Sequence, residues 1–268
     1  MAKILAVTNQ KGGVGKTTTA VNLAACLAEA GQRVLLIDLD PQGNATTGCG
    51  VVKREALPTV YQILIGRSTI PDTVLQTDFG FHLLPANREL AGAEVDLISL
   101  EQREYRLRDA LKEVRADFDF ILMDCPPALN MLTVNGLAAA DRVMIPMQCE
   151  YYALEGLTDL VATLRKVRAN LNPALEIEGL LRTMFDPRST LTQQVSRELE
   201  GHFGDKVYKT IIPRNVRLAE APSYGKPVIA FDRGSRGAQG YLLLAQELLD
   251  RRTDNKAAGV AAVAGVAQ

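Results

Sequence analysis

The chain has 268 residues, of which 47% are hydrophobic and 23% are charged. These proportions are ordinary for a globular protein and exclude a largely disordered chain, and the length suits one α/β domain with a large core. A formal net charge of −1 at pH 7 gives no overall attraction to nucleic acids or anionic membranes, so any such binding must come from a local patch.

Short apolar segments alternate along the chain with segments of helical periodicity. The expected strands are 4–8, 34–39, 81–84, 118–123, 142–147, 177–185 and 207–212. The expected helices are 16–30, 101–114, 129–140, 153–170, 191–203 and 237–250. Almost continuous apolar character is typical of strands that are buried on both faces. The alternation therefore predicts a single-domain, doubly wound α/β fold, in which helices flank a mainly parallel sheet that binds ligands at the carboxyl ends of its strands.

The first strand leads into a glycine-rich loop where the first helix begins. The loop reads Lys11-Gly12-Gly13-Val14-Gly15-Lys16-Thr17-Thr18. Glycines let backbone N–H groups curl around phosphate oxygens, and the helix N-terminus adds its partial positive charge. We therefore predict a nucleotide-binding P-loop, in which Lys16 reaches the β- and γ-phosphates and the Thr17 hydroxyl ligates Mg²⁺. The usual motif has a glycine five residues before Gly15, whereas this chain has Gln10 there and an additional lysine, Lys11.

Aspartates follow two of the apolar strands, where a doubly wound sheet presents groups to its ligands. Asp38 and Asp40 precede a Pro-Gln-Gly-Asn turn, which is able to change shape when a phosphate leaves. Carboxylates in this place can orient a water molecule or hold Mg²⁺. Asp124 follows Ile-Leu-Met and precedes Cys-Pro-Pro, as does the aspartate with which P-loop enzymes hold the magnesium shell. We predict that Thr17, Asp40 and Asp124 form a metal site.

The loop Lys-Gly-Gly-Val-Gly-Lys-Thr-Thr resembles the deviant P-loop of the ParA/MinD superfamily. Three further segments, 148–156, 209–217 and 220–227, narrow this resemblance when they are taken together with 38–44. The combined set resembles the ParA/Soj chromosome-partitioning ATPases, over about residues 3–250.

This resemblance implies an ATPase of slow intrinsic turnover that uses ATP and Mg²⁺ and has a fold like that of the nitrogenase iron protein. Lys11 would reach across a nucleotide-sandwich homodimer to the partner's phosphates, much as arginine fingers do elsewhere. Asp40 would position the attacking water, with Asp38 in a supporting role. The residues that the resemblance places near the adenine are Met184, Pro213 and Asn215.

The family binds double-stranded DNA without sequence preference as an ATP-bound dimer, through basic residues of the C-terminal third. Between residues 182 and 236 this chain carries ten Lys and Arg against six Asp and Glu. Arg188 and Arg217 match positions that the family uses for DNA, and Arg214 is a further candidate. The resemblance also implies a ParB/Spo0J-type partner that stimulates hydrolysis, a nucleoid-associated place in the bacterial cytoplasm, and a role in chromosome or plasmid segregation.

A MinD-like membrane-associated positioning ATPase is the alternative, because it uses the same P-loop. Such a protein ends in a basic amphipathic helix, whereas no Phe, Leu, Ile or Trp follows Arg252, so we expect no membrane binding. The chain begins without a charged leader, and no apolar run reaches membrane-spanning length, which indicates a cytoplasmic protein. We expect an ATPase domain over 1–252 and a poorly ordered Ala/Gly-rich tail over 253–268.

The four cysteines are scattered and form no C-x-x-C pair, so neither a zinc site nor a disulfide framework is indicated. They are Cys26, Cys49, Cys125 and Cys149. We expect them to be small buried hydrophobic residues in a reducing compartment. An iron–sulfur cluster shared across a dimer through Cys125 is a further alternative.

Overall fold

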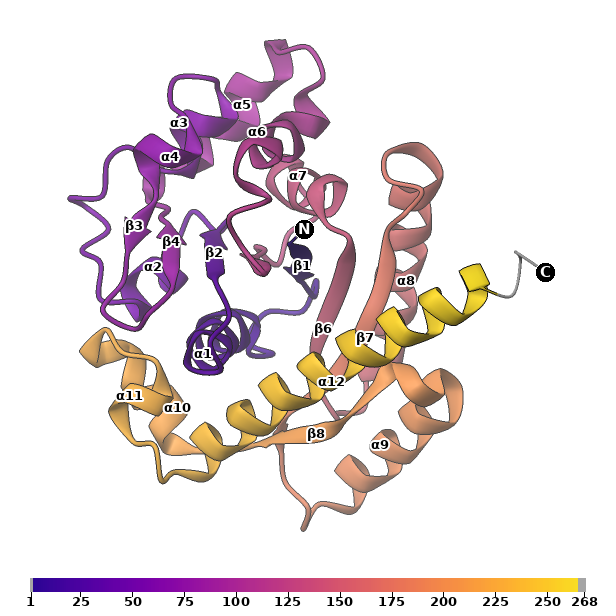
Figure 1. Cartoon of the computed structure of the whole chain (residues 1–268). Coiled ribbons are helices and arrows are strands. Elements are labelled where there is room, and N and C mark those ends of the chain that lie inside the picture. The colour runs from indigo at the N-terminus through magenta and orange to yellow at the C-terminus, as the bar shows by residue number, and fades with distance from the viewer. Residues whose placement is uncertain (1, 265–268) are drawn as a thin grey trace.

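Within the residues that the structure describes, eight strands form one sheet (Figure 1). The structure is a computed structural model, and it describes residues 2–264, with side chains through Thr253. The strands are β1 Lys3–Val7, β2 Val34–Asp38, β3 Leu75–Gln76, β4 His82–Leu84, β5 Phe120–Asp124, β6 Arg142–Gln148, β7 Glu176–Phe185 and β8 Val207–Pro213. Their order is β3-β4-β2-β5-β1-β6-β7-β8, and all neighbours are parallel except β3 and β4. The predicted doubly wound, mainly parallel α/β fold is confirmed, and only the two-residue β3 was not predicted.

Helices connect the strands. They are α1 Lys16–Glu29, α2 Asn44–Gly48, α3 Val60–Leu64, α4 Ile70–Thr73, α5 Ala93–Asp96, α6 Arg106–Val114, α7 Met131–Ala139, α8 Ala153–Asn170, α9 Thr190–Phe203, α10 Val216–Glu220, α11 Val228–Phe231 and α12 Arg236–Ala264. Short 3₁₀ helices occur at Arg88–Gly92, Leu97–Ser99, Arg103–Tyr105, Gly204–Lys206 and Ala221–Tyr224. The six predicted helices correspond to α1, α6, α7, α8, α9 and α12, so the prediction missed the short helices of four or five residues.

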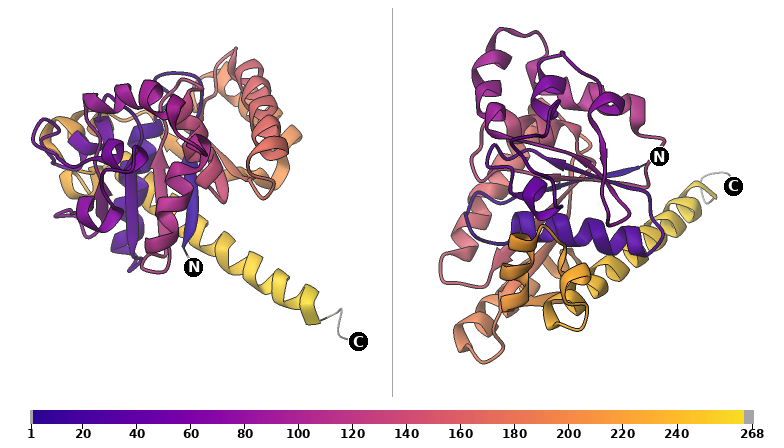
Figure 2. Two further views of the ribbon diagram at one scale, coloured as in Figure 1. Left: turned by 90° about the horizontal axis from the view of Figure 1, so that it is seen from above. Right: turned by 90° about the vertical axis from the view of Figure 1, so that its left-hand side faces the viewer.

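Each face of the sheet buries its own hydrophobic cluster. In β1, Ile4 and Ala6 belong to the cluster that includes α6, α7 and α8, while Leu5 and Val7 belong to the cluster that includes α1 and α12. Successive side chains of a strand point to opposite faces, so an apolar strand can fill both clusters. Figure 1 and the right view of Figure 2 show this layering, with α1 and α12 on one side of the sheet and α6 and α7 on the other.

The last helix is longer than predicted. We expected it to end at Asp250, but α12 continues to Ala264, and its last turns extend beyond the body of the molecule (Figure 2). Alanine is the strongest helix former, so an alanine-rich sequence readily prolongs a helix that has already begun. Residues 265–268 of the expected tail lie outside the described part of the chain. Among the described residues, no helix has both the length and the apolar character that crossing a membrane requires.

The sheet brings three strand ends together at one edge. Val7 of β1 is in register with Asp124 of β5, and Asp124 is in register with Asp38 of β2. The chain leaves β1 directly into the glycine-rich loop and enters α1 at Lys16. The P-loop and both groups of aspartates therefore meet at the carboxyl edge of the central strands, as the sequence predicted.

Candidate nucleotide-binding site

The glycine-rich loop has a backbone that few other residues adopt. Gly13 and Gly15 have φ angles of 73° and 86°, in the left-handed region that favours glycine. Gly15 is the N-cap of α1, and no side chain caps the first turn of that helix. The first N–H groups of a helix need an acceptor, so this end of α1 is suited to bind an anion.

Two lysines of the loop occupy different surroundings. Lys16 is buried, and its Nζ donates to the Lys11 carbonyl oxygen at 3.0 Å. Burial lowers the pKa of Lys16, while the charges of Asp124 and Asp40 act in the opposite direction. The side chain of Lys11 instead lies near the surface and pairs with Glu150, with 2.6 Å between Nζ and Oε2. Only Lys16 therefore faces the buried carboxylates.

Asp124 is buried, and neither of its carboxylate oxygens has a hydrogen-bond partner of normal geometry among the described residues. Burial raises the pKa of Asp124, and the neighbouring charge of Asp38 raises it further, while the Thr17 hydroxyl opposes the shift. A buried carboxylate without partners is unfavourable unless a cation compensates it. These oxygens, beside a threonine hydroxyl, fit a hard divalent cation with oxygen ligands such as Mg²⁺.

Asp38 and Asp40 differ in what surrounds them. Asp38 is fully buried and accepts hydrogen bonds from the Asp40 amide at 3.1 Å and from the amide and hydroxyl of Thr46, each at 2.8 Å. Burial is the main cause that raises the pKa of Asp38 to about 6. Asp40 is half-buried and accepts from the Gln42 amide at 2.9 Å. Asp38 thus fixes the turn that leads into α2, and Asp40 stands on that turn facing more open space.

A cavity of about 380 Å³ lies next to the P-loop. Its lining joins Gly15 and Thr18 to all three residues that the resemblance placed near the adenine, namely Met184, Pro213 and Asn215. The other lining residues are Thr183, Ile212, Arg214, Val216, Leu218, Ala219 and Tyr241. Most of these were missed, because α10 and α12 lie more than two hundred residues after the loop and no motif marks them as its neighbours. Met184 has a φ of 48°, which is uncommon for a residue other than glycine.

The arginine candidates for DNA binding lie at the surface in different contacts. Arg188 is 89% exposed and pairs with Asp186. Arg217 pairs with Glu220 and Asp232. Arg214 lines the cavity beside the P-loop, as a neighbour of Pro213. Arg214 therefore lies within the Pro213–Asn215 loop that the resemblance places near the adenine, and Arg188 and Arg217 do not line this cavity.

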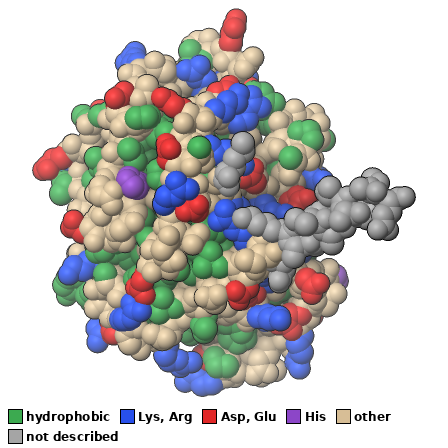
Figure 3. All heavy atoms as spheres, viewed as in Figure 1, with side chains coloured by type: hydrophobic (Ala, Val, Ile, Leu, Met, Phe, Trp, Pro, Cys, Tyr) green, Lys and Arg blue, Asp and Glu red, His purple; other side chains and the backbone are tan. Residues whose placement is uncertain are grey.

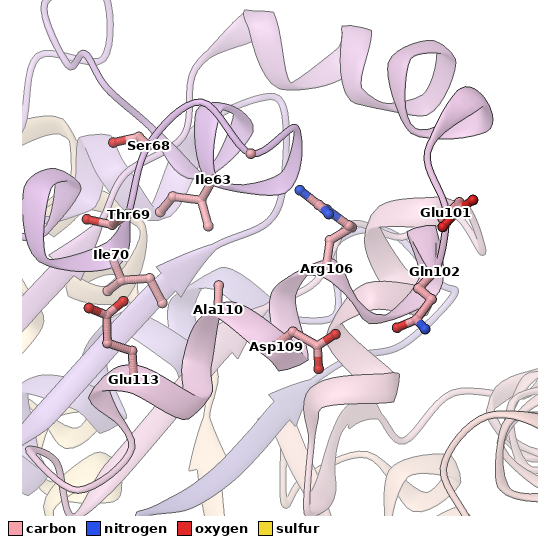
Figure 4. Close-up of a pocket in the computed structure, with 11 residues that line it drawn as sticks. Ile63, Ser68, Thr69, Ile70, Glu101, Gln102, Arg106, Asp109, Ala110 and Glu113 are labelled. Atoms are coloured by element: carbon pink, nitrogen blue, oxygen red, sulfur yellow. The ribbon is translucent and has the colours of Figure 1, made fainter.

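A second cavity, of about 450 Å³, lies away from the P-loop between the α3–α4 turn and α6 (Figure 4). Ile63, Ile70 and Ala110 form its apolar part, and the guanidinium of Arg106 extends toward the α3–α4 turn. None of the predicted site residues lines it.

All four cysteines are buried and free. Burial raises the pKa of the Cys125 thiol, and burial likewise raises that of Cys149, to about 11. Buried thiols with raised pKa values are poor nucleophiles. This burial agrees with the expectation that they are small hydrophobic residues.

Comparison with known proteins identifies the family. The family described as "AAA domain" (AAA_31) matches residues 2–177. The chromosome partitioning protein ParA of Caulobacter vibrioides is 51% identical over 258 residues, 95% of this chain and 97% of that protein. The sporulation initiation inhibitor protein Soj of Bacillus subtilis is 55% identical over 249 residues, 92% of this chain and 98% of that protein. The crystal structure of cobyrinic acid a,c-diamide synthase from Mycobacterium smegmatis with bound ADP and magnesium has a TM-score of 0.84 and 38% identity, and the match covers 95% of this chain and 97% of that one. The chain therefore belongs to the ParA/Soj family of chromosome-partitioning ATPases.

Proposed function

We propose that the chain is an ATP-dependent dimeric switch that segregates DNA. The observation that carries the proposal is the meeting of the two-lysine P-loop with Asp124, whose buried oxygens lack partners in the described chain. The chromosome-partitioning names of the relatives support it, as do the ADP and magnesium bound by the Mycobacterium smegmatis neighbour.

The nucleotide would lie along the loop and the adjoining cavity. Loop amides and Lys16 would bind the phosphate oxygens, since the uncapped start of α1 presents N–H groups there. Thr17, Asp40 and Asp124 would hold Mg²⁺, which neutralises phosphate charge when bound. The adenine would enter the cavity lined by Met184, Pro213 and Asn215.

Hydrolysis would require side chains from two copies. Asp40, on the half-buried turn that Asp38 fixes, would orient the attacking water. Lys11 of the second copy would place its charge at the phosphates as negative charge develops there. A complete site would therefore exist only in the dimer, which makes slow turnover of a single copy a natural consequence.

DNA would bind to a surface to which both subunits of the dimer contribute Lys and Arg side chains. Ten of the 30 Lys and Arg residues lie between residues 182 and 236, and Figure 3 shows Lys and Arg side chains along the lower edge of the molecule, where α9 and β8 lie in Figure 1. Arg188, Arg217 and Arg214 would contact phosphates without reading bases. Hydrolysis, stimulated by a ParB/Spo0J-type partner, would release the DNA. The protein would then act on the nucleoid, in the cytoplasm of a bacterium.

The test is binding of the purified chain to unrelated duplex DNA with ATP, with ADP and without nucleotide, over a series of salt concentrations. Binding that requires ATP and weakens steeply with salt is expected. Anionic liposomes serve as the parallel sample, because a MinD-like protein would bind them. Liposome binding without DNA binding contradicts the proposal.

A further inference from the structure

The side chain of Lys11 is held by its own subunit. Its ammonium pairs with Glu150 at 2.6 Å, and the two side chains are 46% and 50% exposed. Glu150 lies in the segment that joins β6 to α8, far from the P-loop in sequence. The end of β6, which leads into this segment, also contacts the loop, because Gln148 Nε2 donates to the Gly13 carbonyl oxygen at 3.1 Å. The Lys11–Glu150 pair therefore belongs to a fixed junction between two loops.

The backbone of Lys11 is anchored from both sides. Its amide donates to Asn9 Oδ1 at 3.0 Å, and Asn9 in turn donates to the Pro146 carbonyl oxygen at 2.8 Å. Its carbonyl oxygen accepts from Lys16 at 3.0 Å. With the backbone fixed in this way, the position of the Lys11 ammonium depends on its own flexible stem and on the partner that the ammonium finds.

We propose that Glu150 is a positioning residue that holds Lys11 against its own subunit, and that this ion pair must open before Lys11 can serve a second copy of the chain. This inference rests on the proposed function, in which Lys11 acts across a dimer. The pair then weakens dimerisation, because one Lys11–Glu150 pair must open in each subunit and the free energy of opening raises the dimer dissociation constant.

The surface beside Glu150 suits a second copy. Tyr151 and Tyr152 follow it in sequence, are 75% and 68% exposed, and contact each other with 5.1 Å between ring centroids. Exposed tyrosines with little other contact are typical of protein–protein contact surfaces. A copy that docks here covers the tyrosines and comes within reach of the Lys11 side chain in the same step.

The exposure of the pair determines how large its effect is. Ion pairs that solvent reaches are weak and are screened by salt. Opening one pair per subunit changes the dimer dissociation constant by the product of two small factors, about 2- to 30-fold in all. Glu150 thus shifts the equilibrium modestly toward the monomer, by an amount small enough for ATP binding to reverse.

The experiment compares the wild-type chain with Glu150→Gln by analytical ultracentrifugation, with Mg²⁺ and a non-hydrolysable ATP analogue, at low and at high salt. The matched control is Glu155→Gln, an exposed glutamate on α8. We expect Glu150→Gln to lower the dimer dissociation constant by about 2- to 30-fold at low salt. The difference from wild type should shrink at high salt, and Glu155→Gln should match the wild type.

Two further measurements distinguish an effect of Glu150 on the position of Lys11 from a general effect of Glu150 on folding. ADP affinity and melting temperature, both measured on the monomer, should be the same in Glu150→Gln and in the wild type. An unchanged or higher dimer dissociation constant in Glu150→Gln overturns the inference while leaving the proposed function intact. A wild-type chain that stays monomeric with the ATP analogue overturns the proposed function, and this inference with it.

Discussion

At the scale of single residues, Asp38 and Asp40 have the same side chain but differ in burial and in hydrogen bonding. Asp38 uses its carboxylate to hold the backbone of its own loop, through the amides of Asp40 and Thr46. Asp40 makes one short-range hydrogen bond, to the Gln42 amide, and stays half-buried. The Asp38 carboxylate is therefore occupied by hydrogen bonds within its own loop, whereas the Asp40 carboxylate accepts only the one from Gln42 among the described residues.

Asp40→Ala should separate nucleotide binding from hydrolysis. Removal of a group that orients a proton-transferring water slows a reaction by about 10²- to 10⁴-fold, and the Asp40 carboxylate accepts one hydrogen bond among the described residues, from the Gln42 amide. We expect ATP affinity to fall much less than the steady-state rate, because Thr17 and Asp124 remain to hold Mg²⁺, so that the ATP-bound dimer accumulates on DNA. Lys16→Ala is the contrasting variant, because it should lose about 10-fold or more in ATP affinity itself. Phosphate release and fluorescent-nucleotide binding measure the two effects, and normal hydrolysis by Asp40→Ala would falsify the role of Asp40.

The buried Asp38 predicts a pH dependence of stability. Its pKa in the folded chain, about 6, lies above that of an unfolded aspartate, so the folded state binds the proton more tightly. The contribution of this group to the free energy of unfolding is therefore present at low pH and is lost as pH rises from about 4 to about 6. Asp38→Asn removes this titration and also the charge that raises the pKa of Asp124. Both changes act in the same direction, so the free energy of unfolding of the wild type minus that of Asp38→Asn should be more positive near pH 4 than near pH 7. Urea unfolding of both proteins at the two pH values measures it, and a difference that does not vary with pH refutes the assignment.

At the scale of elements, α12 covers the edge strand of the sheet. Glu247 of α12 accepts from the amides of Lys209 and Thr210 in β8, at 2.9 and 2.8 Å, and also pairs with Arg251. Lys209 and Thr210 are not among the residues that pair with β7, because the register shifts between Val207 and Ile211, and β8 is the last strand of the described sheet. A helix side chain thus satisfies donors that an exposed sheet edge would leave open to a foreign strand.

Glu247→Ala should therefore destabilise the fold and expose this edge. Loss of two hydrogen bonds to a charged acceptor, partly replaced by water, should cost about 2–3 kcal/mol in the free energy of unfolding. Gln246→Ala is the matched control on the same helix, where the exposed Gln246 side chain donates to Asp250, and it should cost about 0.5 kcal/mol or less. Urea unfolding compares the two variants, and equal effects would show that Glu247 contributes no more than a surface residue.

The long elements were predictable from the sequence, and the short ones were not. Helix α8 has the predicted bounds, because 18 residues contain enough turns for the apolar spacing to be read. Helix α3 has five residues, and it begins at a capping box. In this box the side chains of Thr59 and Gln62 each accept from a backbone amide at the start of the helix. The Thr-x-x-Gln pattern indicates the start of a helix, but five residues are too few to show the apolar helical periodicity that usually follows such a start. The P-loop and the aspartates were predictable for the same reason as the long strands, since each follows directly from a strong local pattern.

At the scale of the whole molecule, the base side of the nucleotide cavity depends on contacts that no local pattern specifies. Tyr241 of α12 lines the cavity beside Gly15 and hydrogen-bonds to Thr19 of α1 at 3.1 Å. Asn22 of α1 accepts from the Val228 amide at 2.6 Å. These contacts join the first helix to the C-terminal third, so residues from both ends of the sequence are needed to form the cavity. The same third carries the ten Lys and Arg residues of 182–236, so the candidate DNA surface and the candidate nucleotide cavity share this part of the chain.

Arg188→Ala and Arg217→Ala should each weaken DNA binding by the ATP-bound dimer and make it less sensitive to salt. Each variant removes one phosphate contact per subunit and two per dimer, so the slope of log affinity against log salt should become shallower by about 2. Within the described part of the chain, Arg188 pairs with one carboxylate, that of Asp186, whereas Arg217 pairs with two, so we expect the larger loss for Arg188→Ala. Arg33→Ala is the matched control, because Arg33 is also exposed and ion-paired, with Asp119, but lies outside residues 182–236. Fluorescence anisotropy with duplexes of unrelated sequence provides the slopes. If the Arg33 variant lowers the slope as much as the other two, then the positive charge acts through the overall field of the protein, and the C-terminal third is not the surface that holds DNA.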